Sequence, residues 1–269
     1  MTDTVQVDVK APVATITLNK PERLNALDVD MWEGVAHACR AIDAAGDVRV
    51  AILRGAGGCF CAGLDVKAGS TLSSLGIEAS PGAAAAAIHG HLSHLQACFS
   101  AVERLRVPVI AAIERACIGG GLELALCRDI RLAAESTVFS IPEVHLGIVP
   151  DMGGTQRLPR TIGIGRAKEL IYSARRIDAA TALSIGLINA VYPAGELPAR
   201  AEALAAEIAA NAPLAVQAAK RAIDGTYWRD REAWLAWEAQ QAIGPLLSND
   251  RVEGMRAAAA RTPADFKGR

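Results

Sequence analysis

The stretch Cys117-Ile118-Gly119-Gly120-Gly121-Leu122-Glu123 follows an apolar strand and opens an apolar helix. The strand is predicted over Val109–Ile113 because it is β-branched and introduced by Pro108. The helix is predicted over Leu122–Leu126. Consecutive glycines let a backbone turn tightly, and the first amides of a helix lack internal partners at its electropositive end. This turn therefore suits an oxyanion with a carboxylate beside it, which indicates acid–base chemistry on a carbonyl compound.

The same residues also have a purely structural interpretation. Three glycines at a strand–helix junction can serve close packing alone, and Glu123 can be a helix acid stabilised by the dipole. A single glycine-rich motif does not decide between the two interpretations. The other motifs of the chain bear on the choice.

Composition limits the class of protein. The chain has 269 residues, 51% of them hydrophobic, which is enough for one large core or a core with an appendage. Its formal net charge of −1 argues against nucleic acid or an anionic membrane as partner. Neither a signal peptide nor a membrane-spanning run is visible, so we expect a soluble cytoplasmic protein. Six scattered cysteines without a Cys-x-x-Cys pair indicate buried free thiols: Cys39, Cys59, Cys61, Cys98, Cys117 and Cys127.

Strands and helices alternate along most of the chain. The pattern predicts a hairpin (5–10 with 14–18), a helix over 31–45 capped by Asp28, a strand at 50–54, a mobile loop at 68–82 and a helix over 84–105. Further strands are predicted at 130–133, 138–141 and 189–192, and helices at 155–162 and 166–173. Only helices follow Gly195, so we predict an α/β core over residues 1–195 and a helical region over residues 196–269.

Four other segments accompany the glycine turn. They are Pro21-Glu22-Arg23-Leu24-Asn25-Ala26-Leu27, Cys59-Phe60-Cys61-Ala62-Gly63-Leu64-Asp65-Val66-Lys67, Ile141-Pro142-Glu143-Val144-His145-Leu146-Gly147 and Val149-Pro150-Asp151-Met152-Gly153-Gly154-Thr155-Gln156-Arg157-Leu158-Pro159. In this order and spacing, the five motifs closely resemble the crotonase family, also called the enoyl-CoA hydratase/isomerase superfamily. The resemblance runs over essentially the whole chain.

The resemblance implies a spiral of repeated β-β-α units with a helical C-terminal part that forms a trimer or a dimer of trimers. It implies an acyl-coenzyme A substrate and no metal or other cofactor. The thioester oxygen would bind the backbone N–H groups of Leu64 and Gly120. Such donors contribute roughly 2.7–4 kcal/mol each. Further residues expected to bind the substrate are Arg23, Ala26, Ala62, Gly63, Asp65, Lys67 and Gly119, with the terminal Phe266-Lys267 as another candidate for coenzyme A.

The carboxylates distinguish branches of the family. By resemblance to hydratases, Glu143 would protonate Cα while Glu123 positions and activates a water that adds to Cβ. Asp151 instead matches a catalytic aspartate of the dienoyl-CoA isomerase branch, in which Glu143 and Asp151 would transfer protons. Pro150-Asp151 is also an ordinary turn sequence. Hydration is the first hypothesis and isomerisation the second.

Other functional interpretations are weaker. The three histidines of His89-Gly90-His91-Leu92-Ser93-His94 match no zinc spacing, so they are interpreted as solvated residues near a helix start. His145 is interpreted as a surface or supporting residue. Some members of the family bind RNA, but the chain has no Lys/Arg-rich run. A catalytically silent scaffold is difficult to reconcile with both glutamates beside both oxyanion donors.

Overall fold

The computed structural model describes residues 4–65, 80–226 and 230–269. A six-stranded sheet in the order β1-β2-β3-β4-β6-β9 forms its centre. The strands are β1 (Val5–Lys10), β2 (Val13–Leu18), β3 (Val50–Gly55), β4 (Val109–Ile113), β6 (Ile130–Ala134) and β9 (Ala190–Tyr192). Among the described strands of this sheet, β1 and β2 form an antiparallel hairpin, and every later neighbouring pair is parallel. The predicted hairpin and buried strands are therefore confirmed.

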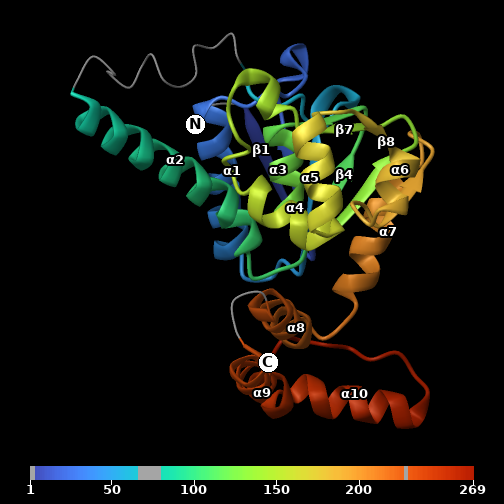
Figure 1. The fold of residues 1–269 in the computed structure, drawn as a ribbon. Helices are drawn as coiled ribbons and strands as arrows, with labels where there is room; N and C mark the ends of the chain where they lie inside the picture. Colours follow the sequence, from blue (N-terminus) through green and yellow to red (C-terminus); the bar gives the residue numbers. More distant parts are fainter. Residues whose placement is uncertain (1–3, 66–79, 227–229) are drawn as a thin grey trace.

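A second, three-stranded sheet lies beside the first. It contains β5 (Ala116–Ile118), β7 (Val138–Ser140) and β8 (Ile177–Asp178). The chain therefore passes from β4 to β5 and then α3 (Gly120–Leu126), and from β6 to β7 and then α4 (Gly154–Ile162). These are the successive β-β-α units that the resemblance implied (Figure 1). The short strands β5 and β8 were not predicted from the sequence.

Helices complete the core on both faces of the large sheet. The main cluster of buried apolar side chains includes residues of α1 (Val29–Ala44), α2 (Pro81–Glu103) and α5 (Ile164–Ser173). Asp28 caps α1 as predicted, because its carboxylate accepts a bond of 3.0 Å from the N–H of Met31. A second cluster forms where α7 (Leu197–Ala209) packs on β3, β4 and β6. The first helix after residue 195 thus covers the sheet.

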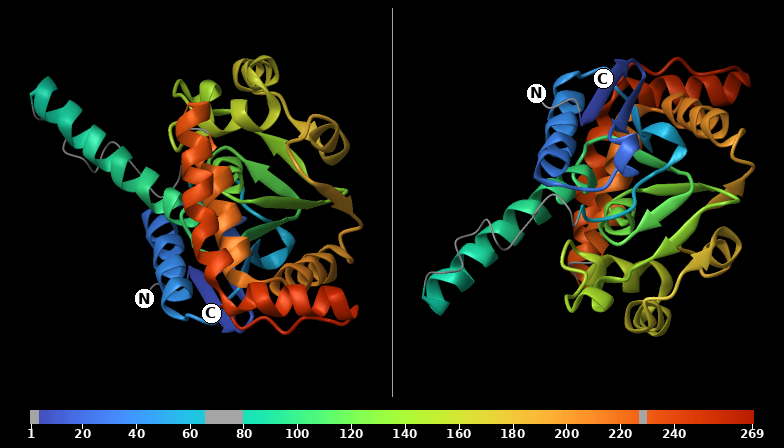
Figure 2. Two further views of the ribbon diagram at one scale, coloured as in Figure 1. Left: turned by 90° about the horizontal axis from the view of Figure 1, so that it is seen from below. Right: turned by 90° about the horizontal axis from the view of Figure 1, so that it is seen from above.

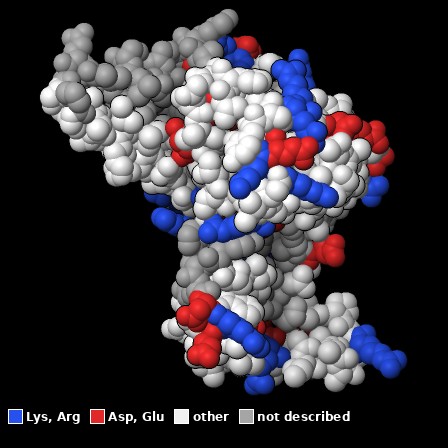
Figure 3. Space-filling model, viewed as in Figure 1, with Lys and Arg blue, Asp and Glu red and all other residues white. Residues whose placement is uncertain are grey.

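The last helices of the chain extend away from this body. They are α8 (Pro213–Gly225), α9 (Arg231–Leu247) and α10 (Asn249–Ala260), whereas α6 (Ala179–Ser184) packs on β7, β8 and β9 within the body. Figure 1 shows α8, α9 and α10 as a separate group below the sheets, while α2 projects from the body in both views of Figure 2. On the face drawn in Figure 3, acidic and basic residues are interspersed. In the described residues no helix is both long and apolar enough to cross a membrane, and the six cysteines are buried and free, as predicted.

Candidate active site

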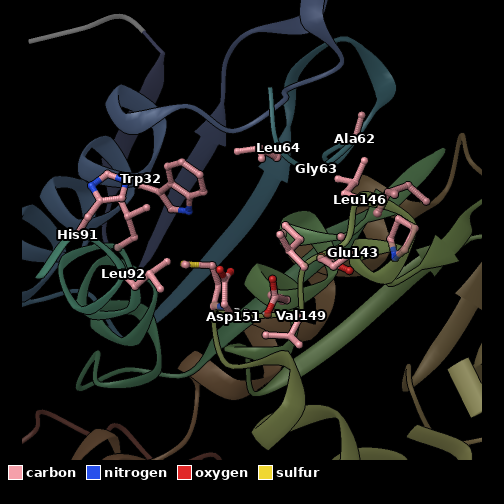
Figure 4. Close-up of a pocket in the computed structure, with 18 of the residues that line it drawn as sticks. Trp32, Ala62, Gly63, Leu64, His91, Leu92, Glu143, Leu146, Val149 and Asp151 are labelled. Atoms are coloured by element: carbon pink, nitrogen blue, oxygen red, sulfur yellow. Dashed lines mark hydrogen bonds between the residues drawn. The ribbon is translucent and has the colours of Figure 1, made fainter. Parts of the chain in front are cut away.

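A cavity of about 610 Å³ opens where the glycine turn meets α1 and α2. Its lining brings together eight residues that the sequence had singled out as site residues. Figure 4 shows part of this lining, with Glu143 and Asp151 facing the interior. The eight residues are Ala62, Gly63, Leu64, Gly119, Gly120, Glu123, Glu143 and Asp151.

The loop that carries Leu64 is held between two neighbouring segments. On one side, the backbone N–H of Cys61 donates to Ala116 O at 2.9 Å, and Cys61 O accepts from Ile118 N at 3.1 Å. The loop therefore pairs with β5 as a neighbouring strand would. On the other side, Leu27 N donates to Gly63 O at 2.7 Å, and Asp65 N donates to Leu27 O at 2.8 Å. These bonds fix the residues on both sides of Leu64. Its own N–H has no backbone acceptor among the described residues.

The glycine turn brings α3 against this loop. Gly119 has a φ of +53°, and a Cβ atom there would lie 2.9 Å from Glu143 Oε1. A Cβ atom at Gly121 would lie 2.7 Å from Cys61 O. Only glycine permits both approaches. The helix begins at Gly120, two residues earlier than predicted, because the glycines form its first turn.

Both predicted oxyanion donors therefore lie at the same cavity. Gly120 is the first residue of α3, so its N–H has no intrahelical acceptor and points out of the positive end of the helix. Leu64 lies across the pocket wall with its N–H similarly uncommitted among the described residues. This arrangement can hold a carbonyl oxygen that becomes negatively charged.

Glu123 is fixed by the turn that follows Asp151. Its Oε1 accepts backbone hydrogen bonds from Met152 at 3.0 Å and from Gly154 at 2.8 Å. Its side chain is almost fully buried. Burial and the charge of Glu143 raise the pKa of Glu123 to about 8, with a further contribution from Asp151, and the two N–H groups lower it only in part.

Glu143 lies on a short 3₁₀ turn (Glu143–Leu146) and is also buried. Burial and the charge of Asp151 raise its pKa to about 7, while a bond from its own backbone N–H opposes the shift. Its Oε2 has no hydrogen-bond partner among the described residues. Burial likewise raises the pKa of Asp151. Interacting carboxyls titrate as a group, so the cluster retains a proton near neutral pH and can act as both acid and base.

Several other predicted residues have different surroundings. Arg23 forms a bidentate ion pair with Asp65, in which Nη2 lies 2.7 Å from Oδ1 and Nε lies 3.2 Å from Oδ2. Neither residue lines the cavity, and Ala26 does not line it either. Lys67 lies outside the described residues. The assignment of these four residues to substrate binding stays a prediction.

The cavity also contains residues that the sequence interpretation missed. Trp32 comes from α1, and Ile88, His91, Leu92 and Leu95 come from α2. The interpretation of His91 as a solvated residue was therefore wrong, because α2 packs on α1 and turns this histidine into the pocket. His94 is exposed and lies 3.1 Å from Glu33, and His145 is exposed as predicted.

Comparison with known proteins agrees with this geometry. The family model for enoyl-CoA hydratase/isomerase matches residues 8–269. The chain belongs to the enoyl-CoA hydratase/isomerase family. It is similar to YngF of Bacillus subtilis, named an enoyl-CoA hydratase/isomerase, with 40% identity over 95% of both chains. It is 35% identical to the peroxisomal Delta(3,5)-Delta(2,4)-dienoyl-CoA isomerase of Arabidopsis thaliana, over 94% of this chain and 92% of that one.

A solved structure supports the family fold. An enoyl-CoA hydratase from Bacillus anthracis superposes with a TM-score of 0.90 and 38% identity, covering 99% of this chain and 100% of that one. Relatives named as hydratases and as isomerases are thus comparably similar to this enzyme. Overall similarity does not choose between the two reactions, so the choice rests on the carboxylates.

Proposed function

We propose that this enzyme adds water across the double bond of a trans-2-enoyl-CoA, in the metabolism of fatty acids or related acyl-CoA compounds. The observation that carries the proposal is Glu123, a buried carboxyl held by two backbone N–H groups in the same cavity as Glu143. Addition of water needs one group to accept a proton from the water and one to deliver a proton to Cα. Two carboxyl groups beside one cavity can perform both tasks.

In the proposed reaction the thioester oxygen accepts hydrogen bonds from the N–H groups of Leu64 and Gly120. The water oxygen bonds to Cβ and loses a proton to Glu123, while Glu143 gives its proton to Cα. The C2–C3 π bond supplies the electron pair for the new C–H bond. Of the two glutamates, the more buried Glu123 has the higher pKa. A water bridging both carboxyls would let the shared proton reach Glu143 before addition.

The second candidate is isomerisation of a dienoyl-CoA, and Asp151 is the observation that favours it. Its side chain lines the same cavity as Glu143, so a proton can be removed at one carbon and returned at another. This reaction has no need for Glu123. A hydrogen-bonded Glu123 therefore favours hydration.

A direct comparison of substrates tests the choice. We expect purified enzyme to hydrate crotonyl-CoA, seen as loss of the enoyl-thioester absorbance, with a kcat/KM at least about 10-fold above that for a 3,5-dienoyl-CoA. The factor corresponds to about 1.4 kcal/mol of additional transition-state stabilisation. Glu143→Gln should lower both rates and serves as the control for background reaction. Faster conversion of the dienoyl-CoA would instead identify the isomerase.

We also propose that the C-terminal helices associate with further copies of the chain. Large apolar side chains are strongly exposed there, among them Leu247 (82%), Met255 (68%) and Leu246 (59%). Exposed apolar surface of this kind marks interaction sites. Light scattering is expected to give the mass of a trimer or of a dimer of trimers. A stable, active monomer would contradict the proposal.

A further inference from the structure

Three buried polar atoms at the cavity have no hydrogen-bond partner among the described residues. They are Glu143 Oε2, Trp32 Nε1 and His91 Nε2. The proposed hydration uses Glu143 as an acid, so bound substrate is the partner that its Oε2 lacks. It makes no use of Trp32 or His91. Buried polar groups are nearly always paired in proteins, so these two nitrogen atoms call for an explanation.

Trp32 differs from the other tryptophans that the structure describes. Its side chain is only 3% exposed, and its ring packs against Phe99 with centroids 6.2 Å apart. Two other tryptophans are paired: Trp234 donates its indole N–H to Ala222 O at 3.2 Å, and Trp237 donates to Arg221 O at 3.0 Å. Apolar packing alone explains the Trp32 ring but not its buried N–H, which favours a hydrogen-bond partner.

Trp32 and His91 lie at one side of the cavity. Figure 4 shows both residues beside Leu92, across the pocket from Ala62 and Gly63, with the indole nitrogen turned towards the interior. The proposed thioester site lies at Leu64 and Gly120. An acyl chain that extends from that site towards α1 and α2 therefore meets Trp32 and His91.

The chemistry of the wall limits what can bind there. An indole N–H only donates, so its partner must accept a hydrogen bond. The described lining residues include the carboxyls of Glu123, Glu143 and Asp151 but no lysine or arginine. A carboxylate on the ligand would add a fourth acid to this cluster without a fixed positive charge. A neutral hydroxyl avoids this repulsion, and it can accept from Trp32 while donating to His91 or to a carboxylate.

We propose that the acyl group accepted by this enzyme carries a hydroxyl group beyond its reacting carbons, bound by the indole N–H of Trp32 and the ring of His91. The proposal rests on the proposed function in one respect, namely that an acyl-CoA occupies this cavity. The apolar side chains of Ile88, Leu92 and Leu95 would pack along the rest of the chain.

The test uses trans-2-enoyl-CoA compounds of four, five and six carbons, each ending in either a methyl or a hydroxymethyl group. For at least one length, we expect kcat/KM for hydration to be roughly 3–10-fold higher with the hydroxyl-ended compound, the scale of one hydrogen bond. Trp32→Phe keeps an aromatic ring and removes the N–H. It should abolish that preference, measured as the ratio of the two kcat/KM values within the variant. His91→Phe is expected to reduce the preference.

Trp237→Phe is the matched control, because it removes an indole N–H that donates to Arg221 O and does not line this cavity. It should retain the full preference. Preference for the methyl-ended compound at every length, or a preference that survives Trp32→Phe, would overturn the inference. Preference for an enoyl-CoA ending in a carboxylate would overturn the choice of hydroxyl.

Failure of the proposed function gives a different result. If none of the compounds is hydrated, hydration is wrong, and titration calorimetry with the same unreacted compounds then measures their Kd values. The same 3–10-fold preference, lost in Trp32→Phe, would support the hydroxyl site independently of hydration. Equal Kd values for each methyl and hydroxymethyl pair would overturn it.

Discussion

Gly120→Pro is expected to lower kcat for crotonyl-CoA hydration at least about 10²-fold in a protein that still folds. Gly120 is the first residue of α3, a position where proline is well accepted in helices. The substitution replaces the N–H hydrogen with a ring carbon and so removes one proposed oxyanion donor. The helix loses no internal bond, because this N–H has no intrahelical acceptor.

Gly120→Ala is the matched control. A Cβ atom at this position would lie 3.0 Å from Leu27 Cδ1, so a flexible side-chain end has to move by a few tenths of an ångström. The N–H is retained, and we expect kcat to stay within about 10-fold of the parent enzyme. Circular dichroism and thermal unfolding check that both variants fold. Near-normal turnover in folded Gly120→Pro would show that the turn serves packing alone.

The sequence predicts the parts of this site that lie on local motifs. Gly119-Gly120-Gly121 indicated a strand–helix turn with free amides. The structure shows its packing reason as well, since a Cβ atom at Gly121 would collide with Cys61. The packing and functional interpretations of the triplet are therefore compatible. The sequence predicted that Glu123, Glu143 and Asp151 meet in one cavity through the family resemblance and not through spacing, because Glu123 belongs to one β-β-α unit while Glu143 and Asp151 belong to the next.

The sequence pattern did not predict the contacts between segments that lie far apart in the chain. The bonds from Met152 and Gly154 to Glu123 span 29 and 31 residues. Trp32 and His91 meet because α1 packs on α2, and nothing in the pattern of either helix shows which face lines a pocket. The strand β5 is three residues long, and its partner β7 comes after another helix and strand. Such short strands carry too little periodicity to be recognised.

Substitution of the three carboxyls is expected to separate the two reactions. For hydration, Glu143→Gln and Glu123→Gln should each lower crotonyl-CoA turnover by roughly 10²-fold or more, the scale for losing a general acid or base. Asp151→Asn should leave the maximal rate within about 10-fold, because water addition uses no third carboxylate. For isomerisation, Asp151→Asn should instead abolish dienoyl-CoA turnover, while Glu123→Gln should have a milder effect.

The pH dependence of Asp151→Asn gives a further distinction. The charge of Asp151 raises the pKa of both Glu123 and Glu143. Its removal should lower both values and shift the pH–rate profile for hydration towards acid, with little change in the maximum. An unshifted profile would show that Asp151 does not interact with the pair. Loss of activity at every pH, in an enzyme whose parent hydrates crotonyl-CoA slowly, would favour isomerisation.

The thermal stability of Glu123→Gln shows whether a loss of activity comes from unfolding. The pKa of Glu123 is raised from 4.5 to about 8 in the folded protein. Because the pKa is higher in the folded state, the free energy of unfolding is unaffected by this group below its unfolded-state pKa. It declines as the pH rises from there towards the folded-state pKa. The glutamine variant cannot ionise, and its Oε1 can still accept the bonds from Met152 and Gly154. We therefore expect its Tm at pH 9 to equal or exceed that of the parent. A variant that is this stable and yet 10²-fold slower has lost chemistry and not structure, which is the result that hydration through Glu123 requires.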